Sequence, residues 1–182
     1  EYSFRMASRR KCAPHRTRDR HASPQKSRTE KFIAPVHFHS APQAPLPDGA
    51  AVVDAGCGLG AGLVALHRQY PRAQLHGLEW SWPLALLCRL RCPWARVRRG
   101  DIWAADWSAY ALVYLFQRPE SMARVAAKAS AEMAPGNWLV SLAFELPGVR
   151  PSMRLQSFAG HGVWVYRLPL QPMAAGAPAG EL

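Results

Sequence analysis

The residues most suited to chemistry lie between Ala51 and Leu63, where the sequence reads AVVDAGCGLGAGL. Asp54 ends an apolar run, and glycines follow it at positions 56, 58, 60 and 62. A glycine-rich turn directly after a buried strand lets a ligand approach the backbone closely. Asp54 would repel a phosphate-bearing ligand, and the loop lacks the lysine of a phosphate-binding loop. The pattern therefore favours a ligand that carries positive charge and no phosphate.

Two further acids follow later expected strands. Glu79 lies 19 residues after Gly60 at the end of one such strand, and Asp101 opens the motif GDIW after the next. Ligands of open parallel sheets bind at the carboxyl ends of the strands, so we expect these acids to share one edge with the glycine loop. Taken singly, each acid is also typical of a helix N-cap or a solvated turn.

Three acids at three successive strand ends, with glycines only at the first, predict S-adenosylmethionine as the ligand, because its sulfonium and ammonium are cations. We expect Asp54 to organise the loop and the ammonium, directly or through water, and Glu79 to accept both ribose hydroxyls. Asp101 should accept the adenine amino group between the apolar faces of Trp80 and Ile102. The remaining predicted cofactor contacts are Gly56, Cys57, Gly58, Gly60 and Phe116.

The stretch FQRPE, residues 116–120, follows the fourth expected strand, where a methyl acceptor should meet the cofactor. Gln117 and Glu120 are the predicted catalytic residues, because an amide carbonyl can orient an amine and a carboxylate can attract a cationic substrate. Their structural alternatives are a strand-end residue and a first-turn helix acid. Glu145 is a further candidate. Phe116 should form an apolar mouth together with tryptophans 80, 82, 103 and 107.

Apolar runs and turn signals predict an α/β fold, with a doubly wound, Rossmann-like, mostly parallel sheet and a C-terminal antiparallel hairpin. The expected strands are 50–54, 74–79, 96–98, 111–116 and 137–146, and the expected helices are 62–70, 82–92 and 119–133. Strands 153–158 and 163–168 should face each other across AGHG as the hairpin. Ordered structure is expected from about residue 36.

The net charge of +11 is concentrated near the amino-terminal end. Residues 1–31 hold ten Lys or Arg against three acids, a balance of +7, and the rest of the chain holds thirteen against nine, a balance of +4. We expect residues 1–34 to be a disordered basic leader, residues 35–170 the folded domain and residues 171–182 a flexible tail. The leader is a candidate arm for nucleic acid or another anionic surface.

The residue types that bind metals do not form a recognisable site. Cys88 and Cys92 would share a helix face, but a zinc site needs four ligands and there is no second pair of closely spaced cysteines. His37 and His39 alternate as on a strand, and the further ligands that a metal would need cannot be placed. We expect no metal, and we interpret the cysteines as buried thiols of a reducing compartment, which predicts a cytoplasmic location. No run approaches 18 uncharged apolar residues, so no segment of this sequence is expected to span a membrane.

The motifs VVDAGCGLG, LHGLEW and RRGDIW resemble the successive cofactor motifs of class I S-adenosylmethionine-dependent methyltransferases, over residues 50–168. The stretch from GDIW to WLVS resembles the mitochondrial protein-lysine methyltransferases of the ATP synthase c-subunit and the adenine nucleotide translocase, and their bacterial relatives. The shared features are an acid-Ile/Leu-Trp turn, a Ser-x-Tyr before the fourth strand and a Met in the following helix.

This resemblance implies N-methylation of a lysine in a protein partner, including a lysine embedded in a membrane, and so adds membrane association to the expected location. FQRP departs from the Asn/Asp-Pro-Pro-aromatic motif of many amine and base methyltransferases, which argues against a base-amine acceptor. Two alternatives remain open. One is a nucleic-acid-binding protein with a methyltransferase-like fold, using the leader and RCPWARVRR, and the other is a small-molecule methyltransferase.

Overall fold

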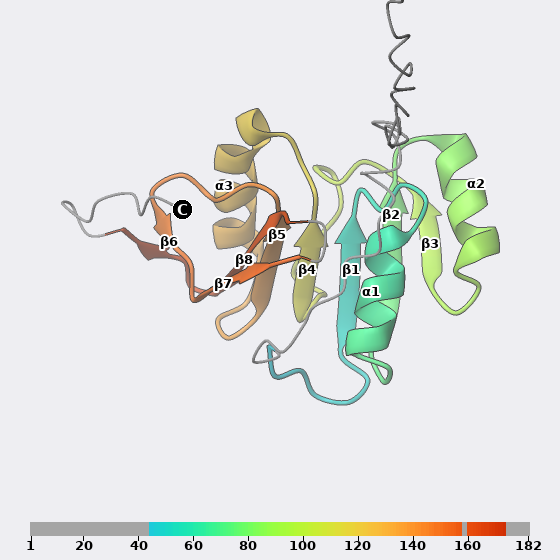
Figure 1. The fold of residues 1–182 in the computed structure, drawn as a ribbon, viewed down its shortest axis with the longest axis horizontal. Helices are drawn as coiled ribbons and strands as arrows, with labels where there is room; N and C mark the ends of the chain where they lie inside the picture. Colours follow the sequence, from blue (N-terminus) through green and yellow to red (C-terminus); the bar gives the residue numbers. More distant parts are fainter. Residues whose placement is uncertain (1–43, 158–159, 174–182) are drawn as a thin grey trace, which may run out of the picture.

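The computed structural model describes residues 44–157 and 160–173 as a single α/β sheet structure (Figure 1). The seven-stranded sheet has the order β3-β2-β1-β4-β5-β8-β7. Its strands are β1 (Ala51–Ala55), β2 (Gln74–Glu79), β3 (Arg96–Arg99), β4 (Leu112–Leu115), β5 (Trp138–Leu142), β7 (Met153–Gln156) and β8 (Gly162–Arg167). The order reverses direction between β1 and β4, which makes their carboxyl ends the topological switch point.

The first five strands pair in parallel, and β8 pairs antiparallel with both β5 and β7. β4 and β5 are buried along their whole length because helices or loops cover both faces of the sheet. The predicted α/β class, the mostly parallel sheet and the C-terminal hairpin are therefore confirmed.

Helices cover both faces of the sheet, and each face has its own hydrophobic core. Leu63 and Leu66 of α1 (Ala61–Gln69) and Cys88 of α2 (Trp82–Arg91) pack against one face, where Val52 lies. Val125 of α3 (Met122–Glu132) packs against the other face, where Val53 lies. Successive residues of β1 thus point into different cores, as the alternation of a strand requires.

Most predicted boundaries agree with the structure to within two residues, and three differ by more or in the kind of element. The expected strand 137–146 ends at Leu142, because its pairing with β8 ends at Val163 and the chain turns at Ala143, which has φ 70°. The expected helix 119–133 begins as a 3₁₀ turn, η2 (Pro119–Ser121), before α3. The expected tail from residue 171 begins with β9 (Gln171–Pro172), which pairs with β6 (Val149–Arg150) in a separate two-stranded sheet.

Several predictions concern residues outside the described ranges. The basic leader, the start of order near residue 36, the histidines at 37 and 39 and the tail beyond residue 173 all lie there. Within the described residues, no helix is both long and apolar enough to cross a membrane.

The topology brings the predicted site residues to one edge of the sheet. The carboxyl ends of the parallel strands all point to the same edge, at the top of Figure 1. The glycine loop follows β1, Glu79 ends β2, Asp101 follows β3 and Phe116 follows β4. This edge is therefore the candidate site.

Candidate functional site

The glycine loop between β1 and α1 depends on left-handed backbone conformations. Gly56, Gly58 and Gly60 have φ values of 93°, 51° and 82°, which residues with a side chain rarely adopt. The N–H groups of Gly56 and Cys57 both donate to the Leu78 carbonyl, at 2.8 and 3.0 Å. The Gly60 N–H donates to the Cys57 carbonyl at 2.7 Å. These amides are used inside the protein, so they do not form the cradle of N–H groups that a phosphate requires.

Asp54 is buried directly beneath this loop, with an exposed fraction of 3%. A Cβ atom on Gly62 would lie 2.4 Å from Oδ2 of Asp54, so α1 can begin this close to the carboxyl group only with glycine there. The pKa of Asp54 is raised to about 8, mainly by burial and also by the nearby Cys88 and Glu79, whereas a backbone hydrogen bond from Leu63 opposes the rise. A cation bound nearby would favour the ionised form of this group.

Glu79 connects the glycine loop to the start of α2. Its Oε2 accepts a hydrogen bond from the Gly58 N–H at 2.9 Å, and its Oε1 accepts one from the Ser81 N–H at 2.8 Å. Each carboxylate oxygen can accept a further bond, so the group retains the capacity to bind ribose hydroxyls. The sequence predicted the ligand role of Glu79 and missed this bracing role, for which a strand-end acid gives no separate signal.

Asp101 and its neighbours lie at the carboxyl end of β3. Oδ1 of Asp101 accepts the Trp103 N–H at 2.9 Å within a turn, so the turn-residue alternative for this acid is present in the structure, whereas residues 102–111 form no helix for it to cap. Ile102 is buried, whereas Trp80 is exposed over 66% of its surface and lies near the Arg99 guanidinium, 5.9 Å from its ring centre. Contacts of Asp101, Ile102 and Trp80 with adenine stay a prediction.

Gln117 reaches from the end of β4 across the glycine loop. Its Nε2 donates to the Ala55 carbonyl at 3.4 Å, and a Cβ atom on Gly56 would lie 2.8 Å from the same nitrogen. The amide therefore stands between the carboxyl ends of β1 and β4. The structure thus places Gln117 where the sequence predicted it, and its catalytic role stays a prediction.

An apolar lip borders Gln117. The ring of Phe116 stacks on that of Phe144, with ring centres 6.3 Å apart and an angle of 3° between the planes. Phe144 follows the left-handed Ala143, and its carbonyl accepts the Ser141 hydroxyl at 2.6 Å. The sequence missed Phe144 because residues 143–146 were expected to continue the strand that begins at residue 137.

The structure gives the other predicted acceptor residues no contact with Gln117 among the described hydrogen bonds. Glu120 is exposed in η2, and Glu145 forms an ion pair with Arg154 at 2.9 Å. The prediction that four tryptophans cluster around the adenine and the acceptor mouth is wrong for Trp107, which is only 1% exposed, and stays a prediction for the other three. Trp107 is buried in the α3 core, Trp103 lies 4.2 Å from the Arg124 guanidinium, and Trp82 is exposed on α2.

Three buried thiols lie between the glycine loop and α2. The sulfur atoms of Cys57 and Cys88 are 3.7 Å apart, and Cys92 Sγ lies 3.8 Å from the Gly60 carbonyl oxygen. A Cβ atom on Gly60 would lie within 3 Å of both Cys88 and Cys92, so the thiols fix how closely α2 approaches the loop. Burial raises the pKa of Cys92 to about 11. Among the described residues, no group of three or more His, Cys, Asp or Glu side chains is arranged to hold a metal ion.

The residues at this edge fit S-adenosylmethionine better than a dinucleotide. The loop amides already donate within the protein, and the buried acid beneath them suits a cation. Glu79 and Asp101 are positioned at the ends of β2 and β3, as a bound nucleoside requires. The described part of the chain thus supplies acceptors for an ammonium and for hydroxyls at a single edge.

A family model described as the ANTKMT methyltransferase domain matches residues 54–153, which is 100 of the 182 residues. The chain belongs to the ANTKMT methyltransferase family. The matched segment begins at Asp54 and includes Glu79, Asp101 and Gln117. Membership of the ANTKMT family confirms the predicted methyltransferase class and S-adenosylmethionine as the methyl donor.

One curated protein is similar in sequence to this ANTKMT-family chain. It is 32% identical over 130 residues to trans-aconitate 2-methyltransferase of Variovorax paradoxus, a match that covers 67% of this chain and 49% of the relative. The chain therefore spans about half the length of this curated relative.

Solved structures share the fold of the chain. An RNA methyltransferase from Salinibacter ruber in complex with S-adenosyl-L-homocysteine is similar, with a TM-score of 0.59, 21% identity and coverage of 72% of this chain and 87% of that one. An O-methyltransferase family 2 protein from Planctomyces limnophilus in complex with apigenin has a TM-score of 0.57, 12% identity and coverage of 69% and 54%. At these identities, the likeness shows the fold alone.

Proposed function

We propose that this chain transfers a methyl group from S-adenosylmethionine to the side-chain amine of a lysine in a protein. Family membership supports the methyltransferase reaction, and the apolar lip with its amide supports an amine acceptor. When bound, the cofactor supplies a methyl group made electrophilic by a positively charged sulfur. The residues at the switch point hold the acceptor in line and keep its amine neutral.

Gln117 is the observation that carries this proposal. Its amide lies over Gly56, at the junction of β1 and β4, where it can accept a hydrogen bond from an incoming amine. The Phe116–Phe144 lip beside it removes water from a lysine head group, which favours the neutral amine. An amide carries no charge, so it can orient the nucleophile while stabilising the protonated amine less than a carboxylate would.

The test compares two glutamine variants of the full chain. Gln117→Leu removes the amide at similar size, and Gln74→Leu makes the same change on an exposed residue at the opposite edge of the sheet. We expect Gln117→Leu to lower turnover about 100-fold with less than a threefold change in cofactor affinity, because positioning acts mainly in the transition state. Gln74→Leu should keep wild-type turnover.

The acceptor is identified by incubating the protein with isotope-labelled S-adenosylmethionine and a cell extract. Peptide mass spectrometry should find methyl-lysine in proteins, and Gln117→Leu should remove the label. Label found only in nucleic acid or only in small molecules would contradict the lysine proposal. The assignment to the methyltransferases would stand in either case.

A small carboxylic acid is the second candidate acceptor. The relative from Variovorax paradoxus is named for trans-aconitate, and the exposed Arg118 beside Gln117 is suited to hold a carboxylate. Adding trans-aconitate to the same assay separates the two candidates. Methyl ester formation that falls at least tenfold in Arg118→Ala, with no methyl-lysine in the extract, would favour the acid.

A further inference from the structure

The outward face of α2 carries an unusual set of exposed apolar side chains. We define the α2 ridge as Trp82, Leu86, Leu87, Leu90 and the following Trp94. Their exposed fractions are 60%, 39%, 50%, 73% and 39%. Trp94 stacks on His67 with ring centres 4.2 Å apart, so the ridge continues onto α1. Apolar residues this exposed, and this close together, mark a binding surface.

The helical spacing places these residues on one side of α2. Trp82, Leu86 and Leu90 follow each other at intervals of four residues, and Leu87 is adjacent. The opposite side of the helix packs against the sheet through Ala85 and Cys88. An α-helix with apolar residues on both sides is normally covered by protein or lipid on both. The outward side of α2 is therefore suited to a further partner.

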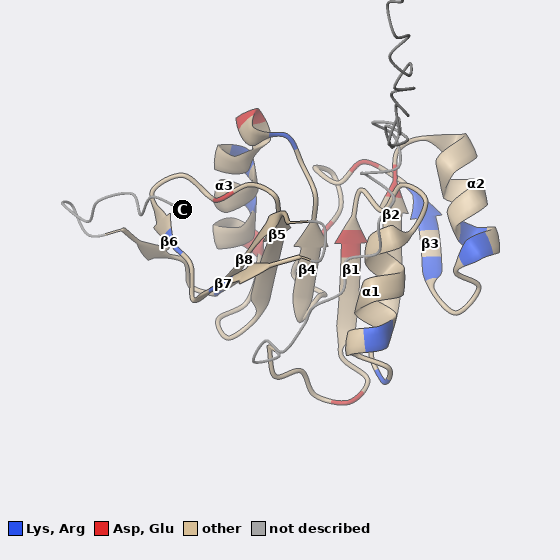
Figure 2. Ribbon diagram, in the orientation of Figure 1, with Lys and Arg blue, Asp and Glu red and all other residues tan. Residues whose placement is uncertain are grey.

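The charged residues of the segment that carries the α2 ridge are all basic. Residues 80–100 contain five arginines and no Asp or Glu. Arg89 and Arg91 lie on α2 itself, and Arg96, Arg98 and Arg99 are exposed on the neighbouring edge strand β3. Figure 2 shows blue segments and no red ones on α2 and β3, at the right-hand end of the molecule. The partner of this surface should therefore be both apolar and anionic.

We propose that the α2 ridge docks the protein on the surface of an anionic lipid bilayer, with α2 lying in the plane of the membrane interface. The tryptophans and leucines enter the boundary between head groups and acyl chains, and the arginines bind lipid phosphates. The long arginine side chains reach the head groups while their stems lie along apolar surface. This attachment does not depend on which acceptor is methylated.

Other occupants fit these residues less well. Nucleic acid would pair with the arginines and stack on tryptophans, but it offers no apolar surface for Leu86, Leu87 and Leu90. A second copy of the chain would place arginine against arginine, because residues 80–100 hold no acid to pair with them. A bilayer with anionic lipids supplies both the apolar layer and the negative charge.

Docking through this ridge would also orient the site. α2 begins three residues after Glu79, so its amino-terminal end lies at the same edge as the glycine loop. The exposed Trp80 lies between them. A protein held by the α2 ridge would therefore present the edge with the candidate site close to the bilayer.

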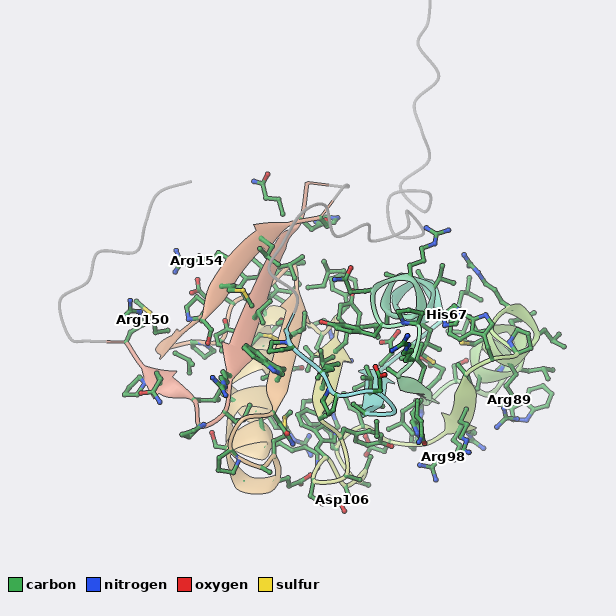
Figure 3. All side chains as sticks on the ribbon, turned by 90° about the horizontal axis from the view of Figure 1, so that it is seen from below. His67, Arg89, Arg98, Asp106, Arg150 and Arg154 are labelled. Carbon is green, nitrogen blue, oxygen red and sulfur yellow. The ribbon has the colours of Figure 1, made fainter. Side chains whose placement is uncertain are left out.

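The experiment is vesicle flotation of the full chain, with phosphatidylcholine vesicles that contain or lack phosphatidylglycerol. Leu90→Glu places a charge on the most exposed leucine of the ridge, and Leu87→Glu repeats the test at a second position. Arg89→Glu reverses a charge beside the ridge. Arg150→Glu reverses an exposed charge on β6, which lies at the end of the molecule opposite α2 in Figure 3.

We expect the wild type to float with anionic vesicles and at least tenfold less with neutral ones. Leu90→Glu and Leu87→Glu should each lower binding about tenfold, because a buried leucine is replaced by a charge in the interface. Arg89→Glu should weaken binding more than Arg150→Glu does. Circular dichroism establishes that each variant is folded.

Several outcomes would overturn the proposal. Unchanged flotation of folded Leu90→Glu and Leu87→Glu would show that the ridge does not enter the membrane. Equal losses in Arg89→Glu and Arg150→Glu would show that only total charge matters. Binding of a transfer RNA that falls in Arg89→Glu, together with no flotation of the wild type, would assign the surface to nucleic acid.

Discussion

Asp54 is a carboxyl group whose ionisation should change when the cofactor binds. Burial raises its pKa to about 8 in the free protein, so it is mainly protonated at neutral pH. A bound cation favours the carboxylate, so binding should release a proton. Cofactor affinity should therefore rise with pH below about 8, by up to about tenfold per pH unit, and level off above it.

Titration calorimetry between pH 6 and pH 9 measures this effect directly. Asp54→Asn removes the titrating group, so the pH dependence should be much weaker in this variant. Asp106→Asn changes an exposed aspartate and should leave the wild-type profile. A wild-type profile that matches that of Asp54→Asn would show that the ionisation of Asp54 does not change when the cofactor binds.

Glu79 should contribute to cofactor binding in two ways at once. Its carboxylate oxygens brace Gly58 and Ser81, and the same oxygens are the predicted acceptors of the ribose hydroxyls. Glu79→Ala should lower cofactor affinity at least tenfold, since hydrogen bonds to a charged group contribute about 1.5–3 kcal/mol each. Wild-type affinity by calorimetry in a folded Glu79→Ala protein would remove this residue from the site.

Residue types predicted the positions of the three acids at the sheet edge better than the positions of the apolar residues near Gln117. Asp54, Glu79 and Asp101 were predictable because strand ends meet at one edge, whatever the details of packing. Phe144 was not predictable, because its position depends on the left-handed backbone at Ala143. A glycine there would have indicated a turn, but an alanine does not. The burial of Trp107 was equally hidden, since aromatic rings suit a core and a pocket alike.

At the scale of elements, the start of α1 is set by the space beside Asp54. Gly62→Ala should destabilise the protein although alanine is the better helix former by about 1 kcal/mol. The added Cβ would lie 2.4 Å from Asp54 Oδ2 and 2.7 Å from Tyr114 Cε1. Overpacking of this kind costs about 1–3 kcal/mol, so the clash should outweigh the gain in helix propensity.

Denaturant unfolding of Gly62→Ala and Ala61→Gly tests this prediction within one helical turn. Ala61→Gly lowers helix propensity without a clash and should cost no more than about 1 kcal/mol. Gly62→Ala should also weaken cofactor binding, because it displaces the carboxyl group of Asp54. An increase in stability for Gly62→Ala would show that the loop and α1 can shift apart.

The elements themselves were predictable where the sequence pattern is local. β2 was predicted with its observed bounds, because residues of alternating burial lie between Pro71 on one side and the helix start marked by Pro83 on the other. β5 ends four residues before the predicted end, because its pairing with β8 decides its length and pairing is not a local property. β6 and β9 were missed because two-residue strands carry no periodicity.

At the scale of the whole molecule, the sheet order follows from connection rules more than from any single residue. Right-handed crossovers from β1 to β2 and β3, and then back to β4 and β5, place the switch point between β1 and β4. The apolar, arginine-rich outer face of α2 has no part in this order. It is a surface property, and it became visible only when the structure separated the outward side of α2 from the buried one.

The uneven charge of the molecule leads to the last prediction. Removing residues 1–31 takes away ten basic and three acidic residues, which lowers the net charge from +11 to +4. Because residues 1–31 have few apolar side chains to bury, removing them should leave the melting temperature and the cofactor affinity nearly unchanged. At low salt, where long-range electrostatic attraction acts, the shortened protein should bind anionic vesicles more weakly than the full chain does. The share of vesicle binding that Leu90→Glu abolishes should persist in the shortened protein, because that share depends on apolar contact.

Thermal unfolding and flotation at two salt concentrations measure both effects. A fall of many degrees in melting temperature would show that residues 1–31 pack on the folded domain.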